Sequence, residues 1–258
     1  MVGRLVGNWA LLLALVAGNG LSASPIGTPR ADFQQSYTLS PNGRVVLQNL
    51  YGDVRITAWD RGEVLVQAIK KSSDRRQLED AQIVVDSSES LVSIHTQYAG
   101  ADAEHPASVE YRIMVPRTAN LENIKLINGG LSISGLEGSI RASSVNGSIK
   151  ADKLAGQVEL STINGHLEAE FERINPANSI SLTSVNGPIK LSIPRGAGAQ
   201  LVAHNLSGGI ESDFGHVWRA SGGHRLRTVV NRGGAQIRVN NVNGGISIRS
   251  SWNRRVMS

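Results

Sequence analysis

The sequence predicts an all-β protein, a single β-solenoid domain built from nine-residue half-repeats with about eighteen residues per coil. Three observations favour this fold. The dipeptide Asn-Gly, which is typical of a corner in the chain, occurs at Asn128, Asn146 and Asn164 at a constant interval of eighteen residues. Between these corners apolar and polar residues alternate, as they do in a half-buried β-strand. At two places in the repeat, charged residues eighteen positions apart have opposite signs, Arg141 with Glu159 and Lys150 with Glu168.

The nine-residue unit is clearest between residues 129 and 173. In each successive unit the third position is aliphatic, the fifth is apolar and the fourth is polar or charged. In a strand the third and fifth side chains lie on one face and the fourth on the other. Related segments occur at 178–195, 244–249 and 43–57. The repeat therefore extends to both ends of the mature chain.

Two architectures fit a nine-residue β repeat. In a meander each unit is a strand joined to the next by an Asn-Gly hairpin, and Glu159 would then face Glu170, a repulsive pair. In a solenoid each strand pairs in parallel with its counterpart one coil away, so that Lys150 lies beside Glu168. The same stacking places Arg141 beside Glu159. These charges favour the solenoid, and the meander is the alternative.

In the solenoid the Asn-Gly dipeptide has a structural role. Asn128, Asn146 and Asn164 would lie directly above one another at one corner, where the side-chain amides of successive coils can hydrogen-bond. The eighth position of the first four units is also apolar, with the opposite parity to the fifth. This change of parity predicts a bend inside each unit, as a corner requires.

Residues 41–127 form a less regular part of the same domain, and residues 128–250 form the regular repeats. Within 60–127 five segments are typical of strands, residues 73–80 predict one short helix, and residues 99–108 predict a loop. We expect these N-terminal strands to belong to the same sheets and to cover the open end of the solenoid.

Residues 1–23 have the pattern of a secretory signal peptide, with Arg4 ahead of an apolar run at 9–17 and small residues after it. The run is too short to span a bilayer, and no later segment is long enough. The chain contains no cysteine, which excludes disulfides, thiolate metal sites and a lipid-bearing cysteine. Residues 24–40 are an N-terminal extension, and an exported location in the periplasm, at the cell surface or outside the cell is expected.

Positive charge is concentrated at the C-terminal end. Between Phe214 and Ser258 there are no acidic residues and no lysines, and there are eight arginines, namely Arg219, Arg225, Arg227, Arg232, Arg238, Arg249, Arg254 and Arg255. The whole chain carries +5, so residues 1–213 carry −3. This asymmetry predicts an anionic partner, such as a surface polymer or lipid headgroups. Arg249 and the basic tail at 251–258 are expected to contact it, whereas nucleic acid is not expected because aromatic residues are not interleaved with the arginines.

Four segments together resemble the bacterial putative adhesin domain family. They are the opening GRVVLQNLYGDVRITAWD, the strand VEYRIMVP, the repeated turns of the form S-V-N-G-x-I, and the closing GGAQIRVNNVNGGISIR. The resemblance covers nearly all of the mature chain and implies an exported β-solenoid with adhesion as its inferred role. It implies no catalytic residue, and it does not cover the basic tail.

Sequence motifs of known enzyme and cofactor sites are absent, so we expect no cofactor and no enzymatic activity. The nine-residue units lack the aspartates of calcium-binding β-rolls. Two groups of residues are candidates for a site. Asp152 and Glu170 occupy the sixth position of units one coil apart and would lie about 5 Å from each other. That separation suits a retaining glycosidase. A loose cluster that could bind zinc is formed by His204, Asp213, His216 and His224.

Three classes of function are compatible with the sequence. The first is a non-catalytic envelope or surface protein that binds an anionic polymer or lipid. The second is a polysaccharide-active β-helix enzyme that uses Asp152 and Glu170. The third is a structural or stress-related component of the envelope.

Overall fold

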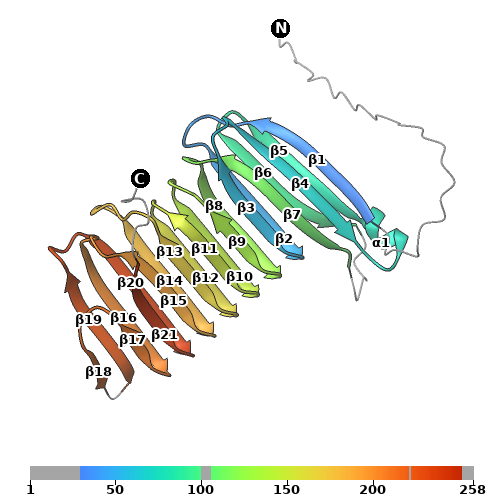
Figure 1. The fold of residues 1–258 in the computed structure, drawn as a ribbon. Coiled ribbons are helices and arrows are strands. Elements are labelled where there is room, and N and C mark those ends of the chain that lie inside the picture. The colour runs from blue at the N-terminus through green and yellow to red at the C-terminus, as the bar shows by residue number, and fades with distance from the viewer. Residues whose placement is uncertain (1–29, 100–105, 221, 252–258) are drawn as a thin grey trace, which may run out of the picture.

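The computed structural model of the chain describes residues 30–99, 106–220 and 222–251. The expected signal peptide, and the basic tail apart from Ser251, lie outside these residues. The described residues form two large sheets, named A and B here, that face each other across one apolar core. The strands of both sheets are stacked along a single axis, with the N-terminal strands at one end and β18 and β19 at the other (Figure 1).

Sheet A has ten strands within the described residues. In spatial order they are β1 (Arg30–Thr38), β4 (Glu63–Lys71), β7 (Ser108–Pro116), β3 (Val54–Trp59), β9 (Leu131–Ser134), β11 (Ile149–Leu154), β13 (Leu167–Phe171), β15 (Ile189–Pro194), β21 (Ile246–Ser251) and β17 (Ile210–Ser212).

Sheet B has eleven strands in the same part of the chain. In spatial order they are β18 (Val217–Ala220), β19 (Gly223–Val230), β16 (Ala199–Ser207), β20 (Ala235–Asn243), β14 (Ser179–Asn186), β12 (Val158–Asn164), β10 (Ile140–Asn146), β8 (Asn120–Asn128), β2 (Arg44–Tyr51), β6 (Leu91–Tyr98) and β5 (Ala81–Ser88).

The eighteen-residue coil is confirmed, and the meander is wrong. β10 pairs in parallel with β12 and β11 with β13, each in the expected register. The asparagine ladder is present as well: the side-chain amide of Asn146 donates to Asn128 at 2.9 Å, and that of Asn164 donates to Asn146 at 2.9 Å. Two further coils continue this ladder through Asn186 and Asn243.

The charge pairs that favoured the solenoid also form. Arg141 Nε lies 2.9 Å from Glu159 Oε2, and Lys150 Nζ lies 3.9 Å from Glu168 Oε2. A third coil adds Lys190, whose Nζ lies 3.0 Å from Glu168. The hydrogen bond from Lys190 is the main cause that lowers the pKa of Glu168. These pairs are exposed, so they specify the register more than they stabilise the fold.

The two ends of the stack are closed by antiparallel strands. At the N-terminal end β1 and β4 extend sheet A, and β5 extends sheet B beyond β6. The expected helix is present as α1 (Arg75–Asp80), which lies between β4 and β5, and the Asp74 side chain caps it by accepting a hydrogen bond from the Arg76 backbone N–H. At the other end β19 and β18 close sheet B.

Spatial order departs from chain order near the C-terminus. The coil made by β20 and β21 lies between the coil of β14 and β15 and the coil of β16 and β17. The last two strands of the described residues are therefore internal to the stack. Arg238 and Arg249, which lie on them, are flanked by strands on both sides.

Glycine at the Asn-Gly corners is required by close backbone approach. A Cβ on Gly147 would overlap the carbonyl oxygen of Gly129 in the preceding coil, and a Cβ on Gly165 would overlap that of Gly147. Near the corners, polar side chains that point into the core donate hydrogen bonds to the carbonyl oxygens of these corner glycines. For example, Thr162 Oγ1 donates to Gly147 O at 2.9 Å, and Asn241 Nδ2 donates to Gly187 O at 3.1 Å. These buried polar side chains satisfy carbonyls that the corner turns away from water.

The apolar eighth position has two different environments. Leu136 and Leu154 are buried, and the chain bends beside them at Gly135 and Lys153, which have positive φ angles. In the two other units, which contain Val145 and Ile163, the predicted bend inside the unit is wrong, because the strand continues to the asparagine corner. Val145 is only half-buried and Ile163 is 45% exposed, because both point away from the core on the outer face of sheet B.

Alkaline pH should destabilise the fold through a buried tyrosine. Tyr111 lies 2.8 Å from Thr96 Oγ1, and burial raises the pKa of Tyr111 to about 12. The pKa of Tyr111 in the folded protein exceeds the value of about 10 in the unfolded chain. The contribution of Tyr111 to the free energy of unfolding is therefore fully present below pH 10 and is lost as the pH rises to 12, a decrease of about 3 kcal/mol. Urea unfolding between pH 9 and 12 should show this slope, and Tyr111→Phe should reduce it. Tyr98 and Tyr37, whose pKa values are also raised by burial, contribute to the slope that remains. An equal slope in wild type and Tyr111→Phe would contradict the assignment.

Candidate functional site

The acidic pair does not stack as a simple repeat predicts. A β-bulge places Asp152 and Lys153 of β11 opposite the single residue Glu170 of β13, because the register shifts between Ala151 and Leu154. Asp152 instead accepts a hydrogen bond at 2.9 Å from Ser134 Oγ on β9. The bulge removes the one-to-one pairing of the two acidic residues, and the carboxylate of Asp152 is engaged by a hydroxyl. This geometry gives no specific support to an acid–nucleophile pair.

The residues of the loose histidine cluster make separate contacts. His204 lies on β16, where its Nε2 is 3.1 Å from the carbonyl oxygen of Gly222. Asp213 accepts a hydrogen bond at 2.9 Å from the backbone N–H of Ser250. His224 is on β19, and His216 lies in the turn before β18. Within the described ranges no group of three or more histidine or acidic side chains is placed to hold a metal ion.

Arg249 is engaged by acidic side chains that the sequence did not suggest, while its own side chain remains 45% exposed. Its guanidinium forms an ion pair with Glu211 and another, at 3.2 Å, with Asp213. The backbone N–H of Ser250 and the guanidinium of Arg249 together lower the pKa of Asp213. Arg249 therefore joins β21 to β17 and the residues after it. The sequence did not reveal this pairing because both acids precede the arginine-only segment and become neighbours only through the inserted coil. Arg254 and Arg255 lie outside the described residues.

Three other arginines gather on the outer face of sheet B at the C-terminal end. Arg225 and Arg227 of β19 and Arg238 of β20 are exposed, and none of them forms an ion pair within the described part of the chain. Val202 of β16 is paired with Arg227 on one side and with Arg238 on the other. Trp218 of β18 is paired with Arg225. We call these five residues the basic end face.

An apolar stripe runs along the outer face of sheet B toward the basic end face. It has one aliphatic residue per strand, just before the corner, and adjacent strands align these residues in register. Its members are Leu50, Ile127, Val145, Ile163, Val185, Val242 and Leu206. Five of the seven are between 37% and 54% exposed. Six strand spacings of about 4.8 Å make the stripe about 29 Å long. It ends on β16, the strand that also carries Val202.

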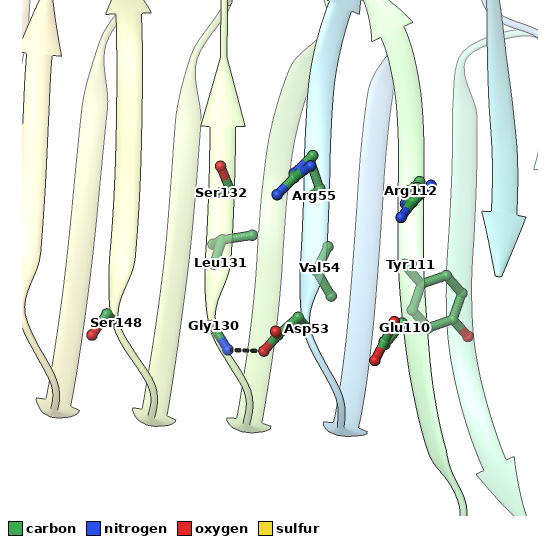
Figure 2. Close-up of a pocket in the computed structure, with 10 residues that line it drawn as sticks. All are labelled: Asp53, Val54, Arg55, Glu110, Tyr111, Arg112, Gly130, Leu131, Ser132 and Ser148. Atoms are coloured by element: carbon green, nitrogen blue, oxygen red, sulfur yellow. Dashed lines mark hydrogen bonds between the residues drawn. The ribbon is translucent and has the colours of Figure 1, made fainter. Parts of the chain in front are cut away.

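A second group of arginines, two residues that form no ion pair within the described residues, lies on the outer face of sheet A. Arg55 of β3 is directly opposite Arg112 of β7, and both are exposed. They line a hollow of about 260 Å³ together with Asp53, Glu110 and Ser132, among other residues. Figure 2 shows the two arginines at one level of the sheet and the two acids at the next level, closer to the corner. We call this the arginine-pair hollow.

The comparison with family models decides the identity of the fold. The model described as Toastrack DUF4097 matches residues 41–249, which is most of the chain. The chain belongs to the Toastrack DUF4097 family. No curated protein matches this Toastrack chain.

Solved structures are also similar to this Toastrack chain. One is a putative cell adhesion protein from Clostridium sporogenes, with 14% identity, a TM-score of 0.50, and 86% of this chain and 100% of that chain covered. A putative adhesin from Bacteroides fragilis has 10% identity, a TM-score of 0.42 and coverage of 86% and 97%. A putative lipid binding protein from Parabacteroides distasonis has 10% identity, a TM-score of 0.31 and coverage of 85% and 96%. The first of these structures shows that the fold is shared.

Sequence reasoning missed both arginine groups of this Toastrack protein as spatial clusters. Arg55 and Arg112 are far apart in the chain and become neighbours because β7 returns beside β3 after the antiparallel strand β4. The insertion of β20 between β14 and β16 likewise brings Arg238 next to Val202. The arginine-only composition was the available signal for the basic end face. No comparable signal marks the arginine-pair hollow.

Proposed function

We propose that this protein is exported and acts without catalysis as a binding protein of the cell envelope or surface, attached to an anionic polymer or lipid through its basic end face. The observation that carries this proposal is the set of three exposed arginines, Arg225, Arg227 and Arg238, that have no acidic partner in the described part of the chain.

The electrostatics of the basic end face support an anionic partner. Two of the three cationic groups lie on β19 and the third on β20, with β16 between them; they repel one another, and within the described residues none forms an ion pair with a carboxylate. A guanidinium binds phosphate and carboxylate groups through two parallel N–H donors and is weakly hydrated, so it suits such ligands better than lysine. An anionic surface would therefore stabilise the arrangement that the fold creates.

The apolar side chains beside the arginines favour lipid over polymer. Val202 lies between Arg227 and Arg238, and Trp218 is exposed next to Arg225. Tryptophan suits the boundary between water and an apolar phase because its ring is large and its N–H is polar. A lipid surface would use both the arginines and the apolar residues, whereas an acidic polymer would use the arginines.

The N-terminal pattern supports export. Residues 1–23 have the charge, apolar run and small residues of a signal peptide. In the part of the chain that the structure describes, no helix is long and apolar enough to cross a membrane. Attachment at a surface through the basic end face is consistent with both observations.

Removing the three arginines should abolish most of the binding. We expect the mature protein to bind vesicles containing phosphatidylglycerol more tightly than vesicles of phosphatidylcholine alone, with an affinity that falls as salt rises. At about 1 kcal/mol per arginine, the variant Arg225→Ser/Arg227→Ser/Arg238→Ser should bind about a hundredfold more weakly. Co-sedimentation at several salt concentrations measures this change.

A charge-matched variant is the control. Arg44, Arg61 and Arg141 are exposed and each is ion-paired, with Glu122, Glu63 and Glu159 respectively. Replacing these three arginines with serine changes the net charge equally, yet vesicle binding should fall much less. If the two triple variants lost vesicle binding equally, net charge alone would explain the loss. That result would contradict the role of the basic end face.

A further inference from the structure

The arginine-pair hollow contains two like charges at close range, and neither forms a direct ion pair within the described residues. Arg55 and Arg112 are paired in register on adjacent parallel strands, which lie about 4.8 Å apart. Neither guanidinium has an ion pair or hydrogen bond within residues 30–99, 106–220 and 222–251. Their outer neighbours in the same row are Gln67 of β4 and Ser132 of β9, which are neutral. The two guanidinium groups repel each other, a repulsion that Asp53 and Glu110 offset only from the next row, and an oxyanion bound between the arginines would relieve it directly.

The second row of the hollow consists of hydrogen-bond acceptors. Asp53 and Glu110 precede Arg55 and Arg112 by two residues, so they lie on the same face at a distance of about 6.6 Å along the strands. One oxygen of Asp53 accepts the Gly130 backbone N–H at 2.7 Å, and one oxygen of Glu110 pairs with Lys71 at 2.7 Å. Figure 2 shows the Asp53 contact and the separation of the two rows. Among the contacts of the described residues, the other oxygen of each carboxylate has no partner and can accept a hydrogen bond from a ligand.

We propose that this hollow binds an acidic sugar, with the sugar carboxylate on Arg55 and Arg112 and the sugar hydroxyls on Asp53 and Glu110. A simple anion such as acetate or phosphate would contact the arginines but would offer no hydroxyl donors to the two carboxylates of the second row. A uronic acid carries its carboxylate on one side of the ring and hydroxyl donors on the other, so both rows favour it. The hydroxyl of Ser132 adds a donor or acceptor beside the arginines.

This site does not depend on the proposed function. The arginine-pair hollow is on the outer face of sheet A toward the N-terminal end, whereas the basic end face is on sheet B at the opposite end of the stack. The ligand class also differs, because the basic end face has no row of carboxylates among its five residues.

Titration of the mature protein with D-galacturonate, followed by amide chemical shifts at constant ionic strength, tests the proposal. We expect saturable shifts centred on β3 and β7, and a Kd at least tenfold higher in Arg55→Gln and in Arg112→Gln. Acetate, phosphate and neutral galactose should each bind at least tenfold more weakly than galacturonate. Glu110→Ala should weaken galacturonate binding without weakening acetate binding, because it removes a hydroxyl acceptor and leaves both arginines.

Two controls separate this result from misfolding and from the basic end face. The thermal midpoints of Arg55→Gln and Arg112→Gln should lie close to that of wild type, since both side chains are exposed and form no ion pair within the described residues. The triple variant at Arg225, Arg227 and Arg238 should bind galacturonate normally. Unchanged galacturonate affinity in folded Arg55→Gln and Arg112→Gln, or equal binding of acetate and galacturonate by wild type, would overturn the proposal.

Discussion

Replacing Gly147 with alanine is expected to destabilise the fold by about 3 kcal/mol or more. The added Cβ would overlap the carbonyl carbon and oxygen of Gly129 in the preceding coil. Neither backbone can move freely, because Gly129 N–H donates to Asn146 O at 3.0 Å and Gly147 N–H donates to Asn164 O at 3.0 Å. Relief of the overlap must therefore break the backbone pairing between coils. The midpoint of urea unfolding measures the loss.

Gly245→Ala is the matched control for this change. Gly245 follows the corner glycine Gly244 in a later coil, and a Cβ at Gly245 would meet no atom within 4 Å. Its replacement should alter the unfolding free energy by less than about 1 kcal/mol. Similar unfolding midpoints for Gly147→Ala and wild type would show that the close approach of successive corners does not limit stability.

The repeating half of the fold could be predicted because each coil repeats the same local choices. The Asn-Gly interval fixed the length of the coil, and the opposite charges of Arg141 and Glu159 distinguished parallel stacking from a hairpin. Both features depend on residues eighteen positions apart, so they can be recognised without knowledge of the remaining chain. The asparagine ladder followed from the same interval.

The candidate sites could not be predicted to the same degree, because they depend on insertions between coils. The sequence gives no sign that β20 and β21 enter the stack ahead of β16 and β17, and that placement brings Arg249 to Glu211. A one-residue bulge at Lys153, which has a φ of 54°, was enough to remove the one-to-one pairing of Asp152 with Glu170. A strict repeat predicts neither event, since each is a local departure from it.

The apolar stripe could not be predicted from the sequence for a related reason. Hydrophobicity alone assigns the eighth position to the core, yet Ile163 points outward because the strand continues straight to the asparagine corner. In the neighbouring units a positive φ angle turns the chain earlier and buries Leu136 and Leu154. Parity along a strand, and not hydrophobicity, thus decides which apolar residue is available to a partner.

Replacing Ile149 with aspartate should have the largest effect and leave the protein largely unfolded at room temperature. Ile149 is fully buried on β11, between Leu131 of β9 and Leu167 of β13. A carboxylate at this position would be surrounded by aliphatic side chains, and the cost of burying it is about 5 kcal/mol or more even if it becomes protonated. Folded domains are stable by only about 5–15 kcal/mol. Loss of the cooperative thermal transition, measured by circular dichroism, is the expected result.

Ile163→Asp makes the same chemical change at an outward position and is the control for Ile149→Asp. Ile163 is 45% exposed, so a carboxylate there remains hydrated. Its replacement should cost about 1 kcal/mol, mainly from lost contact along the apolar stripe and from lower strand propensity. A folded Ile149→Asp variant, or equal destabilisation by the two substitutions, would mean that the third position of the repeat does not face the core. That result would contradict the solenoid register from which the placement of Arg225, Arg227 and Arg238 on one outer face is derived.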